Sequence, residues 1–401
     1  MKRALKTFIA ITVAALVLLS NLSLLAESDR PVLKFNSDGK FKILMINDMQ
    51  DTDKTLNDTV KLIENSLDKV KPDLVVLVGD NIAGYWLGVN EKKVTKAIDN
   101  IVKPINDRHI PFAVVFGNHD QESGVSKETQ MKIYQSYKNC LAVDEDASLS
   151  NCGTYHLLIK DSEGKNSIFN IWMIDSGTKA SGGGYQSVNA DQIAWYEKTS
   201  KEIMTANGGE PLPSLLFQHI PVPEIYKLLS VVPKGTEESI EGHRTQSKNY
   251  YLLNTTIATG RFLEPPCSPD VNSGEFAAWV KQGDILGAYF GHDHVNDYMG
   301  TLNGIDLGYS PGSGFYQYGS GVYRGVRTFE MDQNDLQNYK TEVLYYKDLI
   351  SEKAGMSLLD PYFASQLRVA IPLLLTAIIL FMLLALFATA ITRRIRKHKP
   401  N

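Results

Sequence analysis

Eight residues of the chain have side chains that a two-metal site uses, and nearly all of them come directly after an apolar segment. They are Asp48, Gln50, Asp80, Asn118, His119, His219, His292 and His294. A shared carboxylate can bridge two cations, and neutral imidazoles complete each coordination sphere without excess negative charge. The residue types therefore predict a site for two divalent or trivalent metal ions.

Three of the motifs share one arrangement, in which an apolar run ends in a glycine and polar side chains follow at once. The runs cover 73–78, 111–116 and 284–290, and they lead into Gly79-Asp80-Asn81, Gly117-Asn118-His119-Asp120 and Gly291-His292-Asp293-His294. Short apolar runs bounded by turn residues are typical of buried strands. The pattern therefore predicts strands that deliver reactive side chains to loops.

The first third of the chain predicts alternating strands and helices. The expected strands are 41–47, 74–78 and 111–116, and the expected helices are 52–70, 89–102 and 127–137. In the first helix, for example, Leu56, Val60 and Ile63 recur at helical spacing. This alternation predicts parallel strands covered by helices, with ligands at the carboxyl ends of the strands.

The rest of the chain is richer in strands. The expected strands are 155–161, 167–174, 214–218, 284–290, 302–307, 324–331 and 341–346, and the expected helices are 191–206 and 275–281. A polar segment over 233–269 has a less regular pattern. His219 and His292 each follow one of these strands, so the arrangement of the first third recurs here.

Both ends of the chain predict a membrane protein. Residues 1–26 begin with basic residues and continue as an apolar run, which is typical of a signal peptide or an uncleaved signal anchor. The uncharged run 369–391 is long enough to span about 30 Å of hydrocarbon as a transmembrane helix. It is followed by a basic tail, 392–401, which is expected in the cytoplasm. The globular domain, 30–348, is expected outside the cytoplasm at the cell membrane, with a connector over 349–368.

The charge of the chain argues against nucleic-acid binding. The two ends carry eight of the 41 Lys and Arg residues and no acids, so the segment between them holds 33 basic and 45 acidic residues. A nucleic-acid-binding surface needs a basic stripe, and this segment is acidic.

The three cysteines do not form a disulfide framework or a CxxC metal motif. Cys140 and Cys152 flank a polar loop and could pair in an oxidising compartment. Three free buried thiols, including Cys267, are an equally good interpretation.

The motifs together resemble those of the calcineurin-like metallophosphoesterase superfamily. In order, they are Asp48-x-Gln50, Gly79-Asp80-Asn81, Gly117-Asn118-His119-Asp120, Gln218-His219 and Gly291-His292-Asp293-His294, over about 42–331. The residues around His119, His219 and His292 are similar to the plant and fungal branch that is purple-acid-phosphatase-like. One such motif would be weak, whereas five in order are strong.

The resemblance implies a four-layer α/β/β/α sandwich that hydrolyses phosphate esters with two metal ions, which would be Mn, Fe or Zn. The implied ligands are Asp48 and His294 for the first ion, Asn118, His219 and His292 for the second, and Asp80 as the bridge. His119 would be the general acid that protonates the leaving alkoxide. Asp120 would either orient His119 or cap the loop.

Two positions depart from the family pattern. Gln50 stands where the family usually has histidine, and its amide oxygen is a weaker ligand that cannot act as a base. A weaker or differently selective first metal is therefore expected. Ala83 stands where purple enzymes have a tyrosine ligand, so no purple colour is expected, and Tyr85 is interpreted as a pocket wall or a packing residue.

Other polar and aromatic residues are open to two interpretations. His243 and Arg244 could reach a substrate phosphate, although an exposed loop is the simpler interpretation. Phe315 or Tyr316, in a glycine-rich turn, could stack on a substrate at the pocket rim, or the turn could be a plain hairpin.

The resemblance leaves an alternative open. The chain could be a catalytically degenerate metal-binding or interaction module on the same fold, because the histidine of the first motif is missing. Against this, the other ligand positions and the acid are all present.

Overall fold

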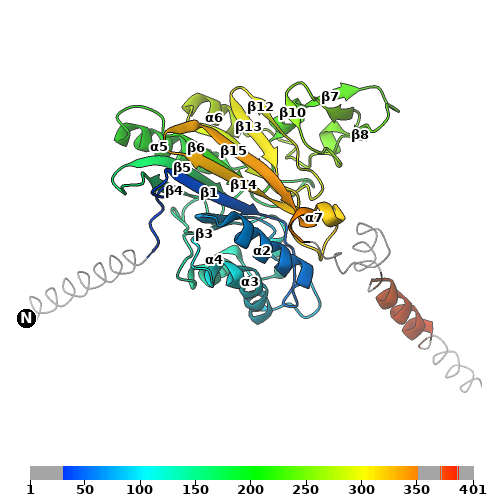
Figure 1. The fold of residues 1–401 in the computed structure, drawn as a ribbon. Helices are drawn as coiled ribbons and strands as arrows, with labels where there is room; N and C mark the ends of the chain where they lie inside the picture. Colours follow the sequence, from blue (N-terminus) through cyan, green and yellow to red (C-terminus); the bar gives the residue numbers. More distant parts are fainter. Residues whose placement is uncertain (1–29, 351–370, 372, 386, 388–401) are drawn as a thin grey trace, which may run out of the picture.

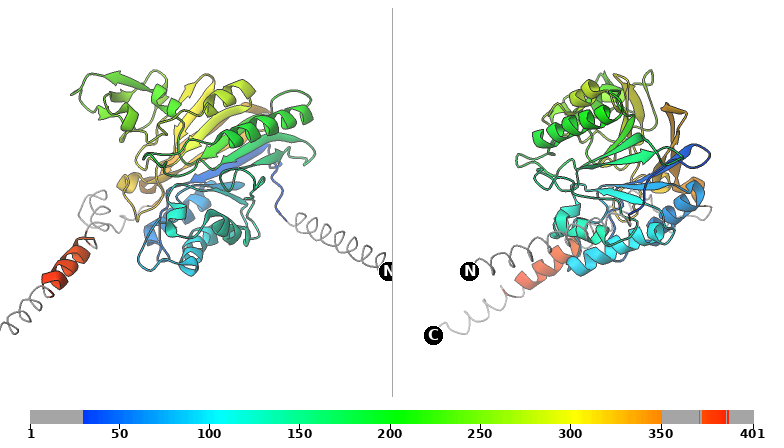
Figure 2. Two further views of the ribbon diagram at one scale, coloured as in Figure 1. Left: turned by 180° about the vertical axis from the view of Figure 1, so that it is seen from behind. Right: turned by 90° about the vertical axis from the view of Figure 1, so that its left-hand side faces the viewer.

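The structure is a computed structural model that describes residues 30–350, 371, 373–385 and 387. Two β-sheets lie face to face in the centre of the domain, and helices cover the outer face of each (Figure 1). Seen from the side, the layers run helices, sheet, sheet, helices (Figure 2). The mixed α/β fold predicted from the sequence is confirmed.

The first sheet has five strands in the order β15-β14-β1-β2-β3. They are β1 (Lys40–Ile46), β2 (Leu74–Val78), β3 (Phe112–Val115), β14 (Gly325–Asp332) and β15 (Asp335–Tyr345). The first three are parallel, as predicted, and β14 and β15 extend the sheet in antiparallel fashion. Its outer face is covered by α2 (Asn57–Val70), α3 (Glu91–Asn106) and α4 (Lys127–Gln135).

The second sheet has seven strands in the order β10-β12-β13-β11-β6-β5-β4. They are β4 (Tyr155–Lys160), β5 (Ser167–Ile174), β6 (Ser214–Gln218), β10 (Ala258–Thr259), β11 (Ile285–Phe290), β12 (Met299–Leu302) and β13 (Ile305–Tyr309). β5, β6, β11 and β13 are parallel neighbours. Helices α5 (Ala190–Ala206) and α6 (Glu275–Gln282) cover its outer face.

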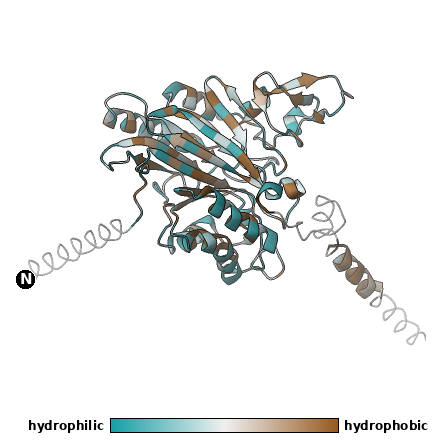
Figure 3. Ribbon diagram, in the orientation of Figure 1, coloured by the Kyte–Doolittle hydropathy of each residue, from teal (hydrophilic) through white to brown (hydrophobic). Residues whose placement is uncertain are grey.

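Helix α3 shows why these segments fold as amphipathic covers. Its buried face includes Val94, Ile98 and Ile101, which recur every three or four residues. The side chain of Asn90 caps the first turn by accepting a hydrogen bond from the backbone N–H of Lys93 at 3.1 Å. The polar faces of the helices are turned to solvent, as their colouring in Figure 3 shows.

Aromatic side chains join the two sheets in the core. Phe329 of β14 meets Phe217 of β6 with ring centroids 5.3 Å apart and Tyr289 of β11 with centroids 4.5 Å apart. All three side chains are buried. This packing holds the sheets in a fixed relation, which brings their strand ends together.

The prediction of a single strand over 302–307 is wrong. The structure has a hairpin there, in which β12 and β13 are joined by Asn303 and Gly304. Both turn residues have left-handed backbones, with φ of 51° and 82°. Asn-Gly is a preferred pair for this kind of two-residue turn, so the sequence contained the information that would have divided the strand.

The segment predicted to be irregular, 233–269, is partly ordered into strands. β8 (Ile240–Glu241) and β9 (Tyr250–Leu253) lie in this segment. With β7 (Leu229–Val232), which directly precedes it, they form a separate three-stranded sheet in the order β7-β9-β8. The strands are short, and a regular period was therefore not visible in the sequence.

The remaining elements are short. They are the 3-10 turns η1 (Asp120–Ser123), η2 (Pro223–Leu228), η3 (Arg244–Gln246) and η4 (Gly321–Tyr323), and the one-turn helix α7 (Tyr346–Leu349). Helix α7 ends the globular domain, and it packs against α2 through the hydrogen bond from the Tyr346 hydroxyl to Asp58 Oδ1 at 2.8 Å.

The predicted signal segment 1–26, most of the connector and the basic tail 392–401 lie outside the described residues. Part of the apolar run 369–391 is described, and its residues 373–385 are helical. Among the described residues, no helix has both the length and the apolar character needed to cross a membrane.

The cysteines are free thiols in the structure. Cys140 and Cys152 are both buried, and burial raises the pKa of each thiol to about 12. The structure therefore agrees with the interpretation of free thiols, except that Cys267 is half-buried and not buried. Thiols with so high a pKa are poor nucleophiles.

Candidate metal centre

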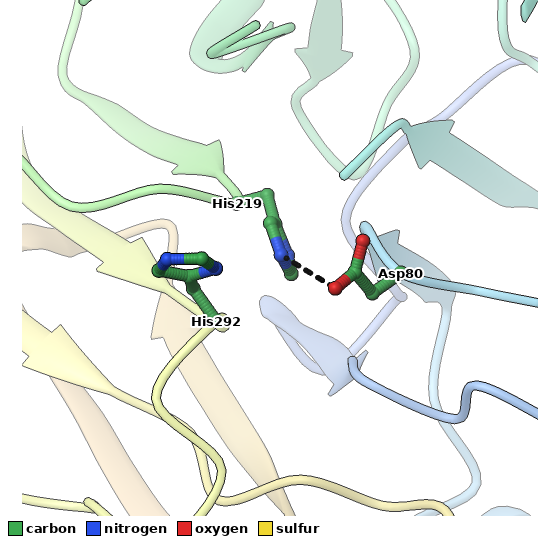
Figure 4. Close-up of side chains that lie close together, drawn as sticks. All are labelled: Asp80, His219 and His292. Atoms are coloured by element: carbon green, nitrogen blue, oxygen red, sulfur yellow. Dashed lines mark ion pairs between the residues drawn. The ribbon is translucent and has the colours of Figure 1, made fainter. Parts of the chain in front are cut away.

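The predicted metal-site residues lie in the loops that follow β1, β2, β3, β6 and β11. Two groups of three buried side chains bring ligand atoms within 4.8 Å of one another: Asp80, His219 and His292, and Asp48, Asp80 and His294. Asp80 belongs to both groups. In Figure 4, Asp80 reaches the site from the first sheet and His219 and His292 from the second. This is the arrangement that two ions bridged by one carboxylate require.

Four of the site residues have a backbone that non-glycine residues rarely adopt. The φ angle is 49° at Asp48, 40° at Gln50, 48° at Asp80 and 74° at His292. Left-handed conformations of this kind cost about 1–3 kcal/mol each and occur where the surrounding structure enforces them, often at functional sites. The loops are therefore held in a strained form that turns these side chains toward a common centre.

Two glycines allow the loops to approach one another. A Cβ atom at Gly117 would lie 2.2 Å from Asp80 Oδ1, and one at Gly291 would lie 2.6 Å from Asp48 Oδ2. No side chain fits at such distances, so these two turns must be glycine for the carboxylates to keep their positions.

The tautomer of His219 leaves its second nitrogen available to a metal. Nδ1 lies 3.0 Å from the carbonyl oxygen of Val78, to which it can donate a hydrogen bond. Nε2 lies 3.2 Å from Asp80 Oδ2 but has no hydrogen-bond partner. A backbone carbonyl that orients an imidazole in this way is typical of metal-binding histidines.

His294 and Asp48 have the same kind of support. His294 Nδ1 lies 2.9 Å from the carbonyl oxygen of Tyr318, and its Nε2 lies 3.3 Å from Asp48 Oδ1. Asp48 Oδ2 accepts hydrogen bonds from Asn47 Nδ2 at 2.7 Å and from the backbone N–H of His292 at 2.9 Å. The other carboxylate oxygen, Oδ1, has no hydrogen-bond partner and faces the site.

The residues present fit a pair of metal ions. Buried ligand atoms without a hydrogen-bond partner include Asp48 Oδ1, Asn118 Oδ1, His219 Nε2 and His292 Nε2. A buried polar atom without a partner costs about 1–3 kcal/mol, and folded proteins leave few of them. Several such atoms around one space are explained if cations bind there, and the mixture of carboxylate, amide and imidazole suits Mn, Fe or Zn.

The pKa values of two site histidines are shifted by the charges around them. Burial by itself would lower the pKa of His219, but Asp80 and Asp48 outweigh this and raise it to about 10. Burial, with the charge on His219, lowers the pKa of His292 to about 3. Without a metal, therefore, a proton on His219 balances the carboxylates. A bound cation would displace that proton.

Gln50 lies within the site. Its Nε2 donates a hydrogen bond to Asp80 Oδ2 at 2.7 Å and lies 3.2 Å from His294 Nε2. Rotation of the amide by half a turn would exchange the nitrogen for the oxygen, which is the atom that a metal can use. The structure thus places Gln50 among the side chains that would surround the first ion, and its role as a ligand stays a prediction.

His119 lies beside the metal-site residues, and a carboxylate holds its ring. His119 Nδ1 lies 2.5 Å from Glu122 Oε2, and Glu122 Oε1 accepts a hydrogen bond from Lys179 Nζ at 2.7 Å. Asp120, which the sequence left as a possible partner, instead caps the loop. It accepts hydrogen bonds from the backbone N–H groups of Gly117 at 2.7 Å and of Asn81 at 2.9 Å.

A cavity of about 310 Å³ opens over the site, and His119 lies in its wall. Three tyrosines contribute to this wall. The ring of Tyr318 stacks on the ring of His294 with centroids 4.1 Å apart, and the rings of Tyr185 and His292 meet edge to face with centroids 4.3 Å apart. Tyr85 is exposed at the rim. A substrate would therefore bind between aromatic surfaces with its reactive group at the metal-site residues.

Phe315 and Arg244, which the sequence offered as substrate contacts, do not line this pocket. Phe315 is buried and packs on Tyr346 with ring centroids 4.9 Å apart, so its predicted place at the pocket rim is wrong. The polypeptide contributes Gln317 and Tyr318 to the pocket instead. Arg244 forms an ion pair with Asp270 at 2.7 Å on the surface, which agrees with the interpretation of an exposed loop.

Sequence reasoning missed Glu122, Lys179, Tyr185 and Tyr318. Glu122 could have been found, because it follows His119 by three residues in the same motif. Lys179 and Tyr185 lie in a loop without a motif, and only the packing of the two sheets brings that loop to the site.

Comparison with known proteins agrees with this geometry. The family model described as calcineurin-like phosphoesterase matches residues 41–296. The chain is 34% identical over 338 residues to "Probable inactive purple acid phosphatase 14" of Arabidopsis thaliana, which covers 75% of this chain and 77% of that protein. It is 29% identical over 344 residues to "Probable inactive purple acid phosphatase 29" of the same plant, which covers 77% and 81%.

A solved structure of a dimetal phosphatase from Danio rerio is also similar. Its TM-score is 0.47 at 11% sequence identity, and the match covers 76% of this chain and 99% of that chain. The family model covers residues 41–296, a range that contains all of the ligand motifs from Asp48 to His294. The chain therefore belongs to the calcineurin-like phosphoesterase family.

Proposed function

We propose that this protein is a metal-dependent phosphoesterase that hydrolyses phosphate esters at a centre of two metal ions. The observation that carries the proposal is the pair of ligand groups that share Asp80, with unpartnered ligand atoms turned toward one space. Family membership supports the same reaction class. Asp48, Gln50 and His294 are the proposed ligands on one side of Asp80, and Asn118, His219 and His292 on the other.

The reaction divides between the ions and the side chains. Bound ions would supply Lewis acidity, polarising the phosphoryl oxygens and activating a water molecule for in-line attack. His119 would give a proton to the departing oxygen. Because Nδ1 of His119 is held by Glu122, the nitrogen left to face the substrate is Nε2, and the carboxylate stabilises the protonated ring that the transfer requires.

One observation favours a second function. Gln50 replaces the histidine that the family's first motif usually has, and two relatives carry "inactive" in their names. A degenerate metal-binding or interaction module on the same fold is therefore the competing hypothesis. Against it, the remaining ligands keep their positions around one centre, and the loops keep a strained backbone. A module without catalytic activity would have no use for that strain.

Metal content and turnover separate the two functions. The purified full-length protein would be stripped of metal, resupplied with Mn²⁺, Fe²⁺ or Zn²⁺, and assayed with p-nitrophenyl phosphate and its bis-ester. The phosphoesterase hypothesis predicts close to two ions per chain together with turnover. One ion or none, without turnover of either ester, would support the module. Asp80→Asn serves as the control, because it replaces the shared carboxylate with an uncharged amide, which is a weaker ligand.

We also propose that residues 369–391 anchor the chain in the cell membrane, with the globular domain outside the cytoplasm. The uncharged length of this run and the basic tail 392–401 support the proposal. In intact cells, added protease should digest the globular domain while a tag on the C-terminus stays protected. Release of the full-length chain by alkaline extraction would contradict a membrane span.

A further inference from the structure

A second polar cavity lies beside the second sheet, apart from the metal centre. It is located between the end of β6, the start of η2 and the first turn of α6. Its volume is about 10 Å³, which is room for one water molecule or one ion. Among the described residues, none lines both this cavity and the one over the metal site. A ligand bound here would therefore be separate from the proposed reaction.

Three buried side chains with oxygen atoms line this cavity. They are Gln218, Glu224 and Glu275. The amide of Gln218 is oriented by its Nε2, which donates a hydrogen bond to the carbonyl oxygen of Ile220 at 2.9 Å. Gln218 Oε1 and Glu224 Oε2 have no hydrogen-bond partner among the described residues. Folded proteins leave few buried polar atoms unpaired, so two of them beside one small cavity indicate a ligand.

The cavity contains a carboxylate without a counter-ion. Among the described residues that line it, none is lysine, arginine or histidine. Glu224 Oε1 accepts a hydrogen bond from Asn272 Nδ2 at 2.7 Å, and this partner is uncharged. Burial, with the charge of Glu224, raises the pKa of Glu275 to about 8, so without an ion Glu275 keeps a proton at neutral pH. A cation would displace this proton and would balance both carboxylates.

We propose that this cavity binds a calcium ion, with oxygen ligands from Gln218, Glu224 and Glu275. Carboxylate and amide oxygens are the ligands that this hard cation prefers. Asn272 and Ser273 are exposed at the edge of the cavity, where the ion would enter and where solvent would complete its coordination. Mg²⁺ fits less well, because it keeps several of its water molecules and the cavity has no room for them.

A calcium ion here would support the loop that carries His219 to the metal centre. Gln218 directly precedes His219, and its side chain is bonded to Ile220 on the other side of the histidine. The ion would join this loop to Glu224 of η2 and to Glu275 at the start of α6. The role of the site is thus structural, and it does not depend on the hydrolysis of phosphate esters.

Calorimetry measures whether the ion binds. The full-length protein would first be loaded with two equivalents of Zn²⁺, which imidazole ligands favour, so that the metal centre is occupied. It would then be titrated with Ca²⁺ and, separately, with Mg²⁺ at pH 8. We expect one Ca²⁺ per chain and weaker binding of Mg²⁺. Absence of Ca²⁺ binding at millimolar concentration would show that the cavity holds a water molecule only, and it would overturn the inference, as would tighter binding of Mg²⁺.

Three variants locate the ion. Glu224→Gln and Glu275→Gln keep the size of the side chain but remove its charge. Each should weaken Ca²⁺ binding roughly tenfold or more, because the number of charged ligands sets the affinity of calcium sites. Glu163→Gln, in the exposed turn between β4 and β5, is the matched control and should bind Ca²⁺ as the unaltered chain does. Unchanged affinity in Glu224→Gln and Glu275→Gln would place the ion elsewhere and overturn the inference.

Thermal unfolding of the zinc-loaded proteins at pH 8 distinguishes loss of the ion from loss of the fold. Ca²⁺ at 100 times its Kd should raise the Tm of the unaltered chain by roughly 5 °C. Without Ca²⁺, Glu275→Gln should be at least as stable as the unaltered chain, because a buried glutamine needs no proton. With Ca²⁺, this variant should be the less stable of the two. The same order of Tm values with and without Ca²⁺ would contradict the inference.

Discussion

Gln50 occupies the position at which this site differs from its family. An amide oxygen is a weaker donor to borderline cations than imidazole, so the first ion is expected to bind less tightly than it would with a histidine at this position. Gln50→His should lower the metal concentration needed for half-maximal activity. A metal titration followed by calorimetry measures this. Gln50→Ala is the comparison variant and should bind the first ion no better than the unaltered chain, and an unchanged affinity in Gln50→His would show that residue 50 is not a ligand.

His119 is expected to transfer a proton and not to bind a metal ion. As the general acid, His119→Asn should leave the metal content nearly intact and reduce kcat by roughly 10²–10⁴. The loss should be smaller for p-nitrophenyl esters than for alkyl esters, because p-nitrophenolate leaves without protonation. Steady-state kinetics over a series of leaving groups, with metal analysis of each preparation, measures both effects. Loss of metal in the variant would assign His119 to the ligands instead.

At the scale of the elements, the turn after β3 is held open by a glycine. A Cβ atom at Gly117 would lie 2.2 Å from Asp80 Oδ1, so Gly117→Ala should displace the shared carboxylate and lower the metal content and activity together. Gly182→Ala is the control, because nothing lies within 4 Å of a Cβ at that position. Metal analysis and kinetics of the two variants should differ, and a fully loaded, active Gly117→Ala protein would contradict the packing argument.

The first turn of α6 contains a buried acid whose charge state depends on folding. Burial, with the charge of Glu224 nearby, raises the pKa of Glu275 to about 8. The unfolded chain loses this proton near pH 4.5 and the folded chain keeps it, so stability should fall as the pH rises from about 4.5 to 8. Glu275→Gln removes this penalty and should raise the free energy of unfolding at pH 8 by roughly 1–3 kcal/mol, with little change at pH 4.5.

Urea unfolding of the Glu275→Gln variant at the two pH values measures the effect, and Glu163→Gln, an exposed acid, provides the comparison. Equal shifts at pH 4.5 and pH 8 would show that packing, and not the charge, is responsible.

At the scale of the whole molecule, the metal centre joins the two sheets. Asp48, Asp80 and Asn118 follow strands of the first sheet, and His219 and His292 follow strands of the second. Each bound ion would therefore stabilise the folded state as a whole, by about 2.7 kcal/mol at a free metal concentration 100 times its Kd. EDTA should lower the Tm of the loaded protein, measured by calorimetry. In Asp80→Asn the shift should be smaller, whereas identical shifts would place the stabilising ions elsewhere.

The sequence determined the alternation of strands and helices and the positions of the ligand motifs, because both depend on local patterns. Periodic apolar residues define α3, and the glycine after each apolar run marks where β2, β3 and β11 end. Asp48, Asp80 and the histidines of the site could be named for the same reason. The boundary of β12 and β13 was missed even though a local pattern, Asn303-Gly304, contained it.

Only the tertiary structure decided which side chains surround those ligands. Lys179 reaches Glu122 across 57 positions of the sequence, and Tyr318 covers His294 from the far side of the pocket. Phe315 lies in the core although its turn is next to the site. Contacts of this kind depend on how the two sheets pack, and that packing is set by aromatic side chains spread over the whole domain. Local periodicity contains no record of them, so the charge and shape of the pocket could be established only from the folded chain.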